Sequence, residues 1–354
     1  MTSKASKLHS ANDEQGRDCG PLRLIYAPDA DDSAPEQYGR YVLGEIRFAP
    51  TPTTTHREDF DYPLVCVPTQ QLLAPPVKEI WLSPTPVEYR QQADIRFGNS
   101  DQVLFGYTHF TLPATGESLE TQIRRRYDAM LELLQSQGYA HLMRVWNYLP
   151  RIGDDIEGME CYRRFCRARH HAFETFYEEL IPNLPATSVL GTSGTDLQIV
   201  FLASRSSPYH YENPRQVSAY HYPQKYGPKS PLFARATLVR WNREHTLFIS
   251  GTASIVGHES QHRGDARAQA EETLRNIEAL IAHVAQSIRM ATPGLGGIRQ
   301  LRVYLRNSGD LGTVRQIVEG RLGAPAQVVY LQAGICRREL LVEMEALLGL
   351  EKPT

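Results

Sequence analysis

Two parts of this chain show the same succession of apolar runs and amphipathic stretches, which predicts a tandem repeat of one α/β unit. The second copy is the clearer one. It starts with a strand-like run at 246–255 and continues with a helix for which Asp265 is a candidate N-cap. The apolar stripe of this helix carries Leu274, Ile277, Ile281 and Val284. Further elements are expected at 301–305 (strand), 313–321 (helix), 326–331 (strand) and 339–345 (strand).

The first copy repeats this order of elements. A strand at 102–107 precedes a helix with one apolar face, which ends near Gly138. That face carries Ile123, Tyr127, Met130, Leu131 and Leu134. Further elements are expected at 142–148 (strand), 159–179 (helix), and 186–190 and 197–202 (strands).

The closing strands of the two copies differ in polarity. In the second copy, Leu340, Val342 and Met344 share one face, and the other face carries Glu339, Leu341, Glu343 and Glu345. This alternation predicts a half-buried strand that carries acids. The corresponding run 197–202 in the first copy is apolar.

Composition limits the classes of function. Of the 354 residues, 41% are hydrophobic and 22% charged, as in ordinary globular proteins, and a net charge of −2 with scattered arginines gives no footprint for nucleic acid. Five cysteines without a CxxC pair argue against a disulfide framework or a structural zinc site. Residues 1–20 are polar, and no run approaches the roughly 18 apolar residues of a membrane span. We therefore expect a cytoplasmic protein.

We expect three regions along the chain: a disordered tail at 1–20, an N-terminal α/β domain at 21–205 and a C-terminal α/β domain at 206–354. Within the N-terminal domain, a strand is expected around 41–48, and a Pro/Thr-rich stretch is expected to cross the surface. The segment 206–233, rich in Tyr, His and Pro, is expected to be irregular, and long loops of this kind are usually functional.

The second copy resembles the small deaminases that act on reactive enamine and imine intermediates. The resemblance rests on SGTAS at 250–254, the helix around 273–276, RVYL at 302–305 and the terminal CRRELLVEMEA. Those proteins are trimers with a chorismate-mutase-like α/β fold and ligand sites at subunit clefts. Two such copies in one chain imply a pseudo-oligomer with a site between the halves.

From about residue 21 the chain resembles the chorismatase family more specifically. The resemblance rests on NPRQVSAYHYPQKYGPKSPLFARAT at 213–237 and FISGTASIVGHESQHRGD at 248–265. These enzymes expel the enolpyruvyl side chain of the dianion chorismate as pyruvate. The resemblance implies chorismate as substrate, no cofactor and no metal, no nucleic-acid or membrane partner, and a monomer or weak oligomer.

The family pattern, carried over residue by residue, implies that Tyr162, Arg169, Tyr222 and Arg235 bind substrate. Arginine suits this role because its planar fork can engage a carboxylate through two parallel hydrogen bonds. Tyr162 and Arg169 are two helical turns apart and therefore share a helix face. The alternatives are that Arg169 is a solvated helix residue and that Tyr222, among several neighbouring tyrosines, only packs.

Glu343 matches the catalytic glutamate of the family. A carboxylic acid in a desolvated site can protonate the terminal methylene of the enol ether, because burial raises its pKa. The alternative is a solvent-facing acid on an edge strand, which is our interpretation of Glu339 and Glu345.

Cys336 and Gly251 match positions at which a cysteine and a small residue go with the aromatising members, which release 3-hydroxybenzoate. Some members also release 4-hydroxybenzoate. For Cys336 the alternative is a small buried hydrophobe. His258, Glu259 and His262 invite a metal or acid–base interpretation, but without an HExxH pattern we favour structural hydrogen bonding. His170 and His171 are interpreted as packing or site-lining residues.

Three other functions stay open. One is a hydrolytic chorismatase, in which water attacks and a dihydrodiol acid forms. Another is an imine deaminase, if only the resemblance of the repeat unit holds. The third is a non-catalytic protein that binds a small aromatic acid.

Overall fold

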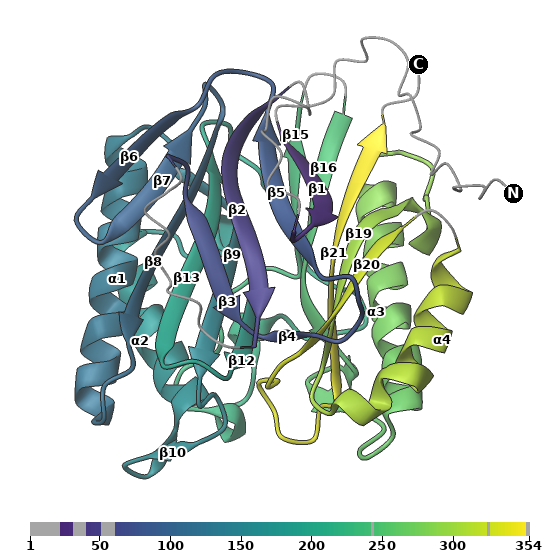
Figure 1. The fold of residues 1–354 in the computed structure, drawn as a ribbon. Coiled ribbons are helices and arrows are strands. Elements are labelled where there is room, and N and C mark those ends of the chain that lie inside the picture. The colour runs from purple at the N-terminus through teal and green to yellow at the C-terminus, as the bar shows by residue number, and fades with distance from the viewer. Residues whose placement is uncertain (1–21, 31–39, 51–60, 242–243, 324–325, 352–354) are drawn as a thin grey trace, which may run out of the picture.

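The computed structural model describes residues 22–30, 40–50, 61–241, 244–323 and 326–351. The predicted N-terminal tail and most of the Pro/Thr-rich stretch lie outside these residues. In the described part, two helix-covered sheets lie side by side, and a third sheet packs between them (Figure 1). None of the described helices is both long and apolar enough to span a membrane.

The first repeat forms a six-stranded sheet in the order β12-β9-β13-β8-β7-β6. Its elements are β6 (Glu88–Gln92), β7 (Ile95–Asn99), β8 (Val103–Thr111), α1 (Gly116–Ser136), β9 (His141–Pro150), α2 (Cys161–Phe176), β12 (Ala186–Thr192) and β13 (Asp196–Ser204). The short pair β10 (Asp155–Ile156) and β11 (Met159–Glu160) precedes α2, which makes this helix shorter at both ends than the expected 159–179.

The second repeat forms a seven-stranded sheet in the order β14-β15-β16-β21-β19-β20-β4. Its elements are β14 (Tyr209–Tyr211), β15 (Ala236–Arg240), β16 (Glu244–Ala253), α3 (Ala266–Ser287), β19 (Ile298–Leu305), α4 (Leu311–Leu322), β20 (Gln327–Gln332) and β21 (Val342–Glu351). The small hairpin β17 (Ile255–Val256) and β18 (Glu259–Ser260) follows β16.

The two sheets share one topology, which confirms the tandem repeat. The strand sequence β12-β9-β13-β8-β7 of the first corresponds to β20-β19-β21-β16-β15 of the second. In each copy one pair is parallel, β9 with β12 and β19 with β20, and the neighbouring pairs are antiparallel. The proposed division at residues 205 and 206 falls between β13 and β14 and remains a proposal.

Each pair of helices covers the outer face of its own sheet (Figure 1). The predicted apolar faces of α1 and α3 are buried in two separate clusters beneath the helices. Asp265 is the N-cap of α3 as expected, because its side chain accepts a hydrogen bond from the backbone N–H of Ala268.

The third sheet, in the order β1-β5-β2-β3, comes from the N-terminal segment. Its strands are β1 (Arg23–Pro28), β2 (Tyr41–Ala49), β3 (Leu64–Pro68) and β5 (Val77–Ser83), while β4 (Gln70–Gln71) pairs with β20. Residues from all three sheets, including Trp81, Trp146 and Phe248, form a third buried cluster between them. The inner faces of both repeats are therefore covered.

This central cluster corrects two expectations about the acidic strand. β21 lies between β16 and β19 rather than at an edge, and both of its faces are buried, so it is not half-buried. Glu345 is 5% exposed and paired with two arginines, so its interpretation as a solvent-facing acid is wrong. Alternation alone cannot reveal a third layer that covers the polar face.

Candidate active site

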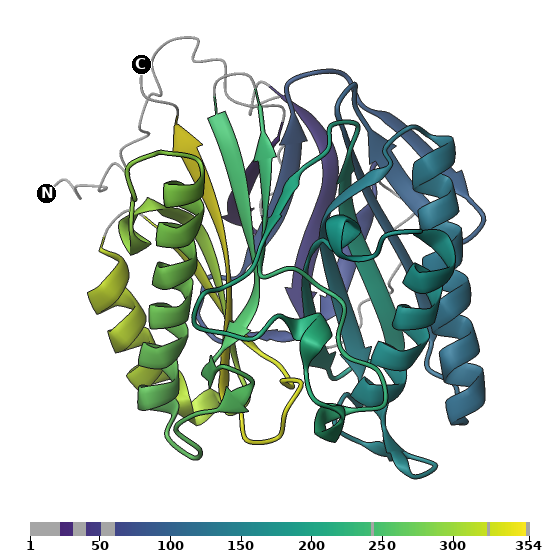
Figure 2. The ribbon, with the colours of Figure 1, turned by 180° about the vertical axis from the view of Figure 1, so that it is seen from behind.

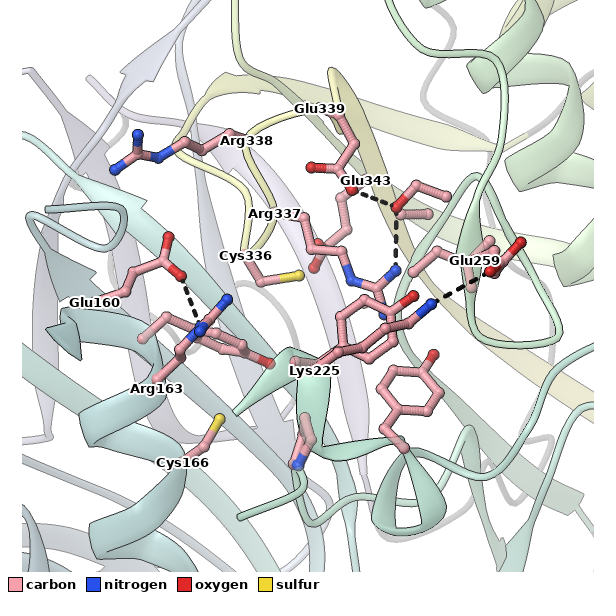
Figure 3. A pocket seen from close by; sticks show the side chains of 18 of the residues that line it. Glu160, Arg163, Cys166, Lys225, Glu259, Cys336, Arg337, Arg338, Glu339 and Glu343 are labelled. Carbon is pink, nitrogen blue, oxygen red and sulfur yellow. Dashed lines mark hydrogen bonds and ion pairs between the residues drawn. The ribbon is translucent and has the colours of Figure 1, made fainter. Parts of the chain in front are cut away.

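A cavity of about 900 Å³ lies between the two repeats (Figure 3). The first repeat contributes the β10–β11 pair and the start of α2, and the second contributes β16, the β17–β18 hairpin and β21. The irregular connection that follows β14 contributes several residues between Tyr222 and Arg235 and crosses between the repeats (Figure 2). A cavity thus lies between the halves, where the resemblance to the deaminases implies a site.

Glu343 lies on β21, opposite Ala253 of β16 and Tyr304 of β19, and its carboxyl group lines the cavity. The residue is only 5% exposed. Burial and the neighbouring Glu345 raise the pKa of the Glu343 carboxyl to about 8, against the opposing effect of Arg144, Arg235 and Arg306. At neutral pH the protonated form of this carboxyl group, which lines the cavity, is therefore favoured.

Gly251 and Glu343 are in close contact. A Cβ placed on residue 251 would lie 2.1 Å from Oε1 of Glu343 and 2.9 Å from Oγ of Ser188. The pairing of β16 with β21 shifts register between Ile249 and Thr252, so Gly251 sits in a bulge. A side chain at residue 251 would displace the Glu343 carboxyl group, because that group occupies the space of a Cβ.

Arg235 and Tyr222 form a hydrogen-bonded pair in the cavity wall. Nη2 of Arg235 donates to the Tyr222 hydroxyl at 2.7 Å and to the Val217 carbonyl at 3.0 Å. The guanidinium group also lies over the ring of Phe233, with 5.0 Å to the ring centroid. Its Nε is buried without a hydrogen-bond partner in the described part of the chain, so the group has donor capacity left.

Tyr162 and Cys336 face the same cavity from opposite repeats. Tyr162 lies in the first turn of α2, and Cys336 lies in the segment that leads to β21. Burial, and then the nearby Glu343, raises the pKa of the Cys336 thiol to about 12. The thiol is therefore neutral. Cys336 is a small, partly buried residue, much as in the alternative interpretation, and it also lines the cavity.

Arg169 is not brought together with the other predicted residues. Its guanidinium group, on a residue that is 3% exposed, donates to the Leu232 carbonyl and to Oγ1 of Thr187, and it stacks on Phe173. The cavity wall does not include it. The alternative interpretation of Arg169 as a solvated helix residue is also wrong, because the residue is buried. Its hydrogen bond to the Leu232 carbonyl binds the segment that leads to Arg235.

Arg337 is a cavity residue that the sequence analysis missed. It lies over the Tyr226 ring, 3.9 Å from the centroid, and Nη1 donates to the His258 carbonyl at 2.9 Å and to Oγ of Ser260 at 3.1 Å. Its position directly after Cys336 was the available signal. One arginine in a chain with many scattered arginines does not stand out by pattern.

The histidines near the cavity make structural hydrogen bonds, as predicted. The His258 ring lies 3.3 Å from the Tyr226 hydroxyl, and the His262 ring lies 3.4 Å from Glu272. Among the described residues, no three His, Cys, Asp or Glu side chains are grouped to hold a metal ion.

Comparison with known proteins agrees with this geometry. The family model "Chorismatase FkbO/Hyg5-like, N-terminal" matches residues 79–203. A 3-hydroxybenzoate synthase from Streptomyces hygroscopicus is 37% identical over 318 residues, which cover 87% of this chain and 91% of that protein. A chorismatase from the same organism is 36% identical over 77% of this chain and 79% of its own length.

A solved structure extends the agreement to the whole fold. The crystal structure of a chorismatase superposes with a TM-score of 0.84 at 31% sequence identity, covering 93% of this chain and 98% of that one. The chain belongs to the FkbO/Hyg5-like chorismatase family.

Proposed function

We propose that this enzyme converts chorismate to pyruvate and 3-hydroxybenzoate, with Glu343 as the general acid. The observation that carries the proposal is the buried carboxyl group of Glu343, whose pKa is raised and which lines the same cavity as Arg235 and Cys336. The name of the relative that is 37% identical, 3-hydroxybenzoate synthase, supports the aromatic product.

Glu343 starts the reaction by protonating the terminal methylene of the enol ether. The side chain becomes an oxocarbenium ion, which weakens the bond between the ring carbon and the ether oxygen. The neighbouring ring hydroxyl oxygen forms a new bond to that ring carbon, the ether bond breaks, and pyruvate leaves. The hydroxyl proton returns to the Glu343 carboxylate, and ring opening with loss of a ring proton gives the aromatic product.

The conversion needs no water, since the atoms of chorismate divide completely between pyruvate and 3-hydroxybenzoate. The neutral Cys336 thiol assists the rearrangement by donating a hydrogen bond to the oxygen that stays on the ring. Metal, nucleotide and redox cofactors have no step to perform in this scheme.

The cations of the cavity hold the substrate. We assign one carboxylate to Arg235, whose partner Tyr222 fixes the guanidinium plane, and we place Tyr162 against the ring. Arg337 is our candidate for the second carboxylate in place of Arg169, because Arg337 lines the cavity and Arg169 does not. Arg169 would act indirectly through the Leu232 carbonyl.

The test is to incubate the purified enzyme with chorismate, without added metal or nucleotide, to separate the products by chromatography and to assay pyruvate. We expect pyruvate and 3-hydroxybenzoate in equal amounts, and a Cys336→Ala variant should lose the aromatic product in favour of other products. A dihydrodiol acid from the wild-type enzyme would assign it to the hydrolytic reaction. Unchanged chorismate, with turnover of an imino acid in a parallel assay, would refute the proposal.

A further inference from the structure

Glu345 lies two residues after Glu343 on the same strand, so both side chains project from the same face of β21. Glu343 lines the cavity, while Glu345 lies behind it among buried residues of the first repeat and the third sheet. The scheme proposed above gives Glu345 no step. A buried ionisable residue next to the acid calls for a physical explanation.

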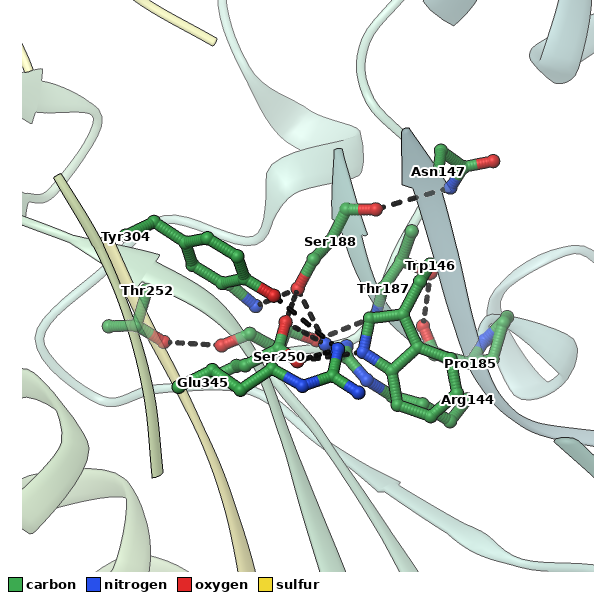
Figure 4. A network of polar contacts seen from close by, with 12 residues as sticks. Arg144, Trp146, Asn147, Pro185, Thr187, Ser188, Ser250, Thr252, Tyr304 and Glu345 are labelled. Atoms are coloured by element: carbon green, nitrogen blue, oxygen red, sulfur yellow. Dashed lines mark hydrogen bonds and ion pairs between the residues drawn. The ribbon is translucent and has the colours of Figure 1, made fainter. Parts of the chain in front are cut away.

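Four donors bind the Glu345 carboxylate, two on each oxygen. Figure 4 shows three of them, Arg144, Trp146 and Ser188, gathered around Glu345. Oε2 accepts hydrogen bonds from Nη2 of Arg144 and Oγ of Ser188, both at 2.5 Å. Oε1 accepts from Nε1 of Trp146 at 2.7 Å and Nη1 of Arg302 at 2.8 Å. All lone-pair directions of the carboxylate are thereby used, so Glu345 has no place for a proton.

The carboxyl group of Glu343 differs from that of Glu345 in its hydrogen bonds. Within the described part of the chain, no side chain or backbone group donates a hydrogen bond to its carboxyl group. Besides Glu345, the ionisable groups that act on it are Arg144, Arg235 and Arg306, together with Tyr162 and Cys336. Two carboxyl groups this close compete for a proton, and the four donors on Glu345 assign it to Glu343.

Ser188 connects this network to the position of the acid. Its Oγ accepts hydrogen bonds from Nη2 of Arg144 at 2.5 Å and from the backbone N–H of Gly251 at 2.9 Å, and it donates to Glu345. Gly251 is the residue against which Oε1 of Glu343 rests. Ser188 therefore fixes the bulge in β16 that contacts the Glu343 carboxyl group.

We propose that Glu345 is a positioning residue for catalysis: held ionised by Arg144, Arg302, Trp146 and Ser188, it keeps the proton on Glu343 and, through Ser188, fixes Gly251 beside it. The catalytic part of this proposal rests on the proposed function of Glu343. The location of the proton does not, and it can be measured without substrate.

The experiment follows the infrared band of the protonated carboxyl group as a function of pH in the free enzyme. The band is assigned to Glu343 by its loss in Glu343→Gln. In the wild type we expect a midpoint near pH 8. In Glu345→Gln we expect the midpoint to fall by at least about one unit, because a negative neighbour is removed, Arg144 loses its counter-charge and Arg302 keeps only Glu79.

Glu79→Gln is the matched control. Glu79, 0% exposed on β5, forms the other buried ion pair of Arg302, but among the described residues it makes no hydrogen bond or ion pair with Arg144, Ser188 or Glu345. The control loses a comparable buried charge and should leave the Glu343 midpoint in place. An unchanged or raised midpoint in Glu345→Gln, or an equal fall in the control, would overturn the proposal.

Ser188→Ala tests the positional half and avoids the loss of a buried charge. With chorismate as substrate, we expect kcat to fall by roughly 10-fold or more with KM nearly unchanged, because a misplaced acid affects the transition state more than binding. In Glu345→Gln the alkaline limb of kcat against pH should move to lower pH with the infrared midpoint. If the wild type leaves chorismate intact while the infrared midpoints behave as expected, the proposed function fails and the proton assignment holds. If Ser188→Ala lowers kcat/KM only by raising KM, with kcat unchanged, the positioning role of Ser188 is refuted.

Discussion

Replacing Glu343 by glutamine removes the proposed acid without changing the volume of the side chain. The amide cannot donate a proton of suitable acidity to the methylene carbon, so the release of pyruvate should fall by about 10²- to 10⁴-fold. Binding of chorismate should be retained, because Arg235 and Tyr222 are untouched. Stopped-flow or calorimetric binding and a pyruvate assay measure the two effects separately.

The same substitution has a consequence for stability that needs no substrate. The carboxyl pKa rises from an ordinary value of 4.5 to about 8 on folding, so between these pH values the native state binds more protons than the unfolded state. The wild-type free energy of unfolding therefore decreases as pH rises through this window. At about 1.4 kcal/mol for each unit, the loss approaches roughly 4–5 kcal/mol above pH 8.

Glu343→Gln has no such proton and should escape this loss. Urea denaturation of both proteins at pH 5 and at pH 9 measures the difference in the free energy of unfolding. We expect the variant to gain several kcal/mol relative to the wild type between the two pH values. A difference that stays constant with pH would refute the argument that Glu343 is held protonated in the fold.

Three further substitutions test the remaining parts of the site. Gly251→Ala places a Cβ 2.1 Å from Oε1 of Glu343, so the acid must move, and kcat should fall by roughly 10²-fold with little change in thermal stability; a normal kcat would contradict the need for glycine. Arg235→Ala removes a charged hydrogen-bond donor and should raise KM by roughly 10- to 100-fold, whereas an unchanged KM would exclude Arg235 from carboxylate binding. Arg169→Met keeps the volume but loses the bonds to Leu232 and Thr187, so urea denaturation should show a loss of roughly 1–3 kcal/mol; loss of binding in a fully stable variant would restore Arg169 to the substrate site.

The fold could be predicted from the sequence where local pattern decides it. The apolar stripes of α1 and α3, the cap at Asp265 and the succession of the main strands and helices along each repeat follow from spacing alone. The third sheet could not be predicted in this way, because its partner faces belong to strands far away in the chain. Its absence from the prediction also explains the error about β21, whose polar face is covered by this layer.

The chemistry of the two acids on β21 shows the same limit at the level of single side chains. Glu343 and Glu345 are equivalent by alternation, and the sequence cannot tell which is ionised. The difference comes from Ser188 and Arg144, which are 157 and 201 residues away from Glu345 along the chain. These donors lie on β12 and β9 of the first repeat, while the acids lie on the last strand of the second. The first repeat thus contributes, through Glu345, to the raised pKa of Glu343. The second repeat alone would leave Glu345 without three of its four donors, Arg144, Trp146 and Ser188, so the proposed protonation of Glu343 at neutral pH depends on the pairing of the two repeats.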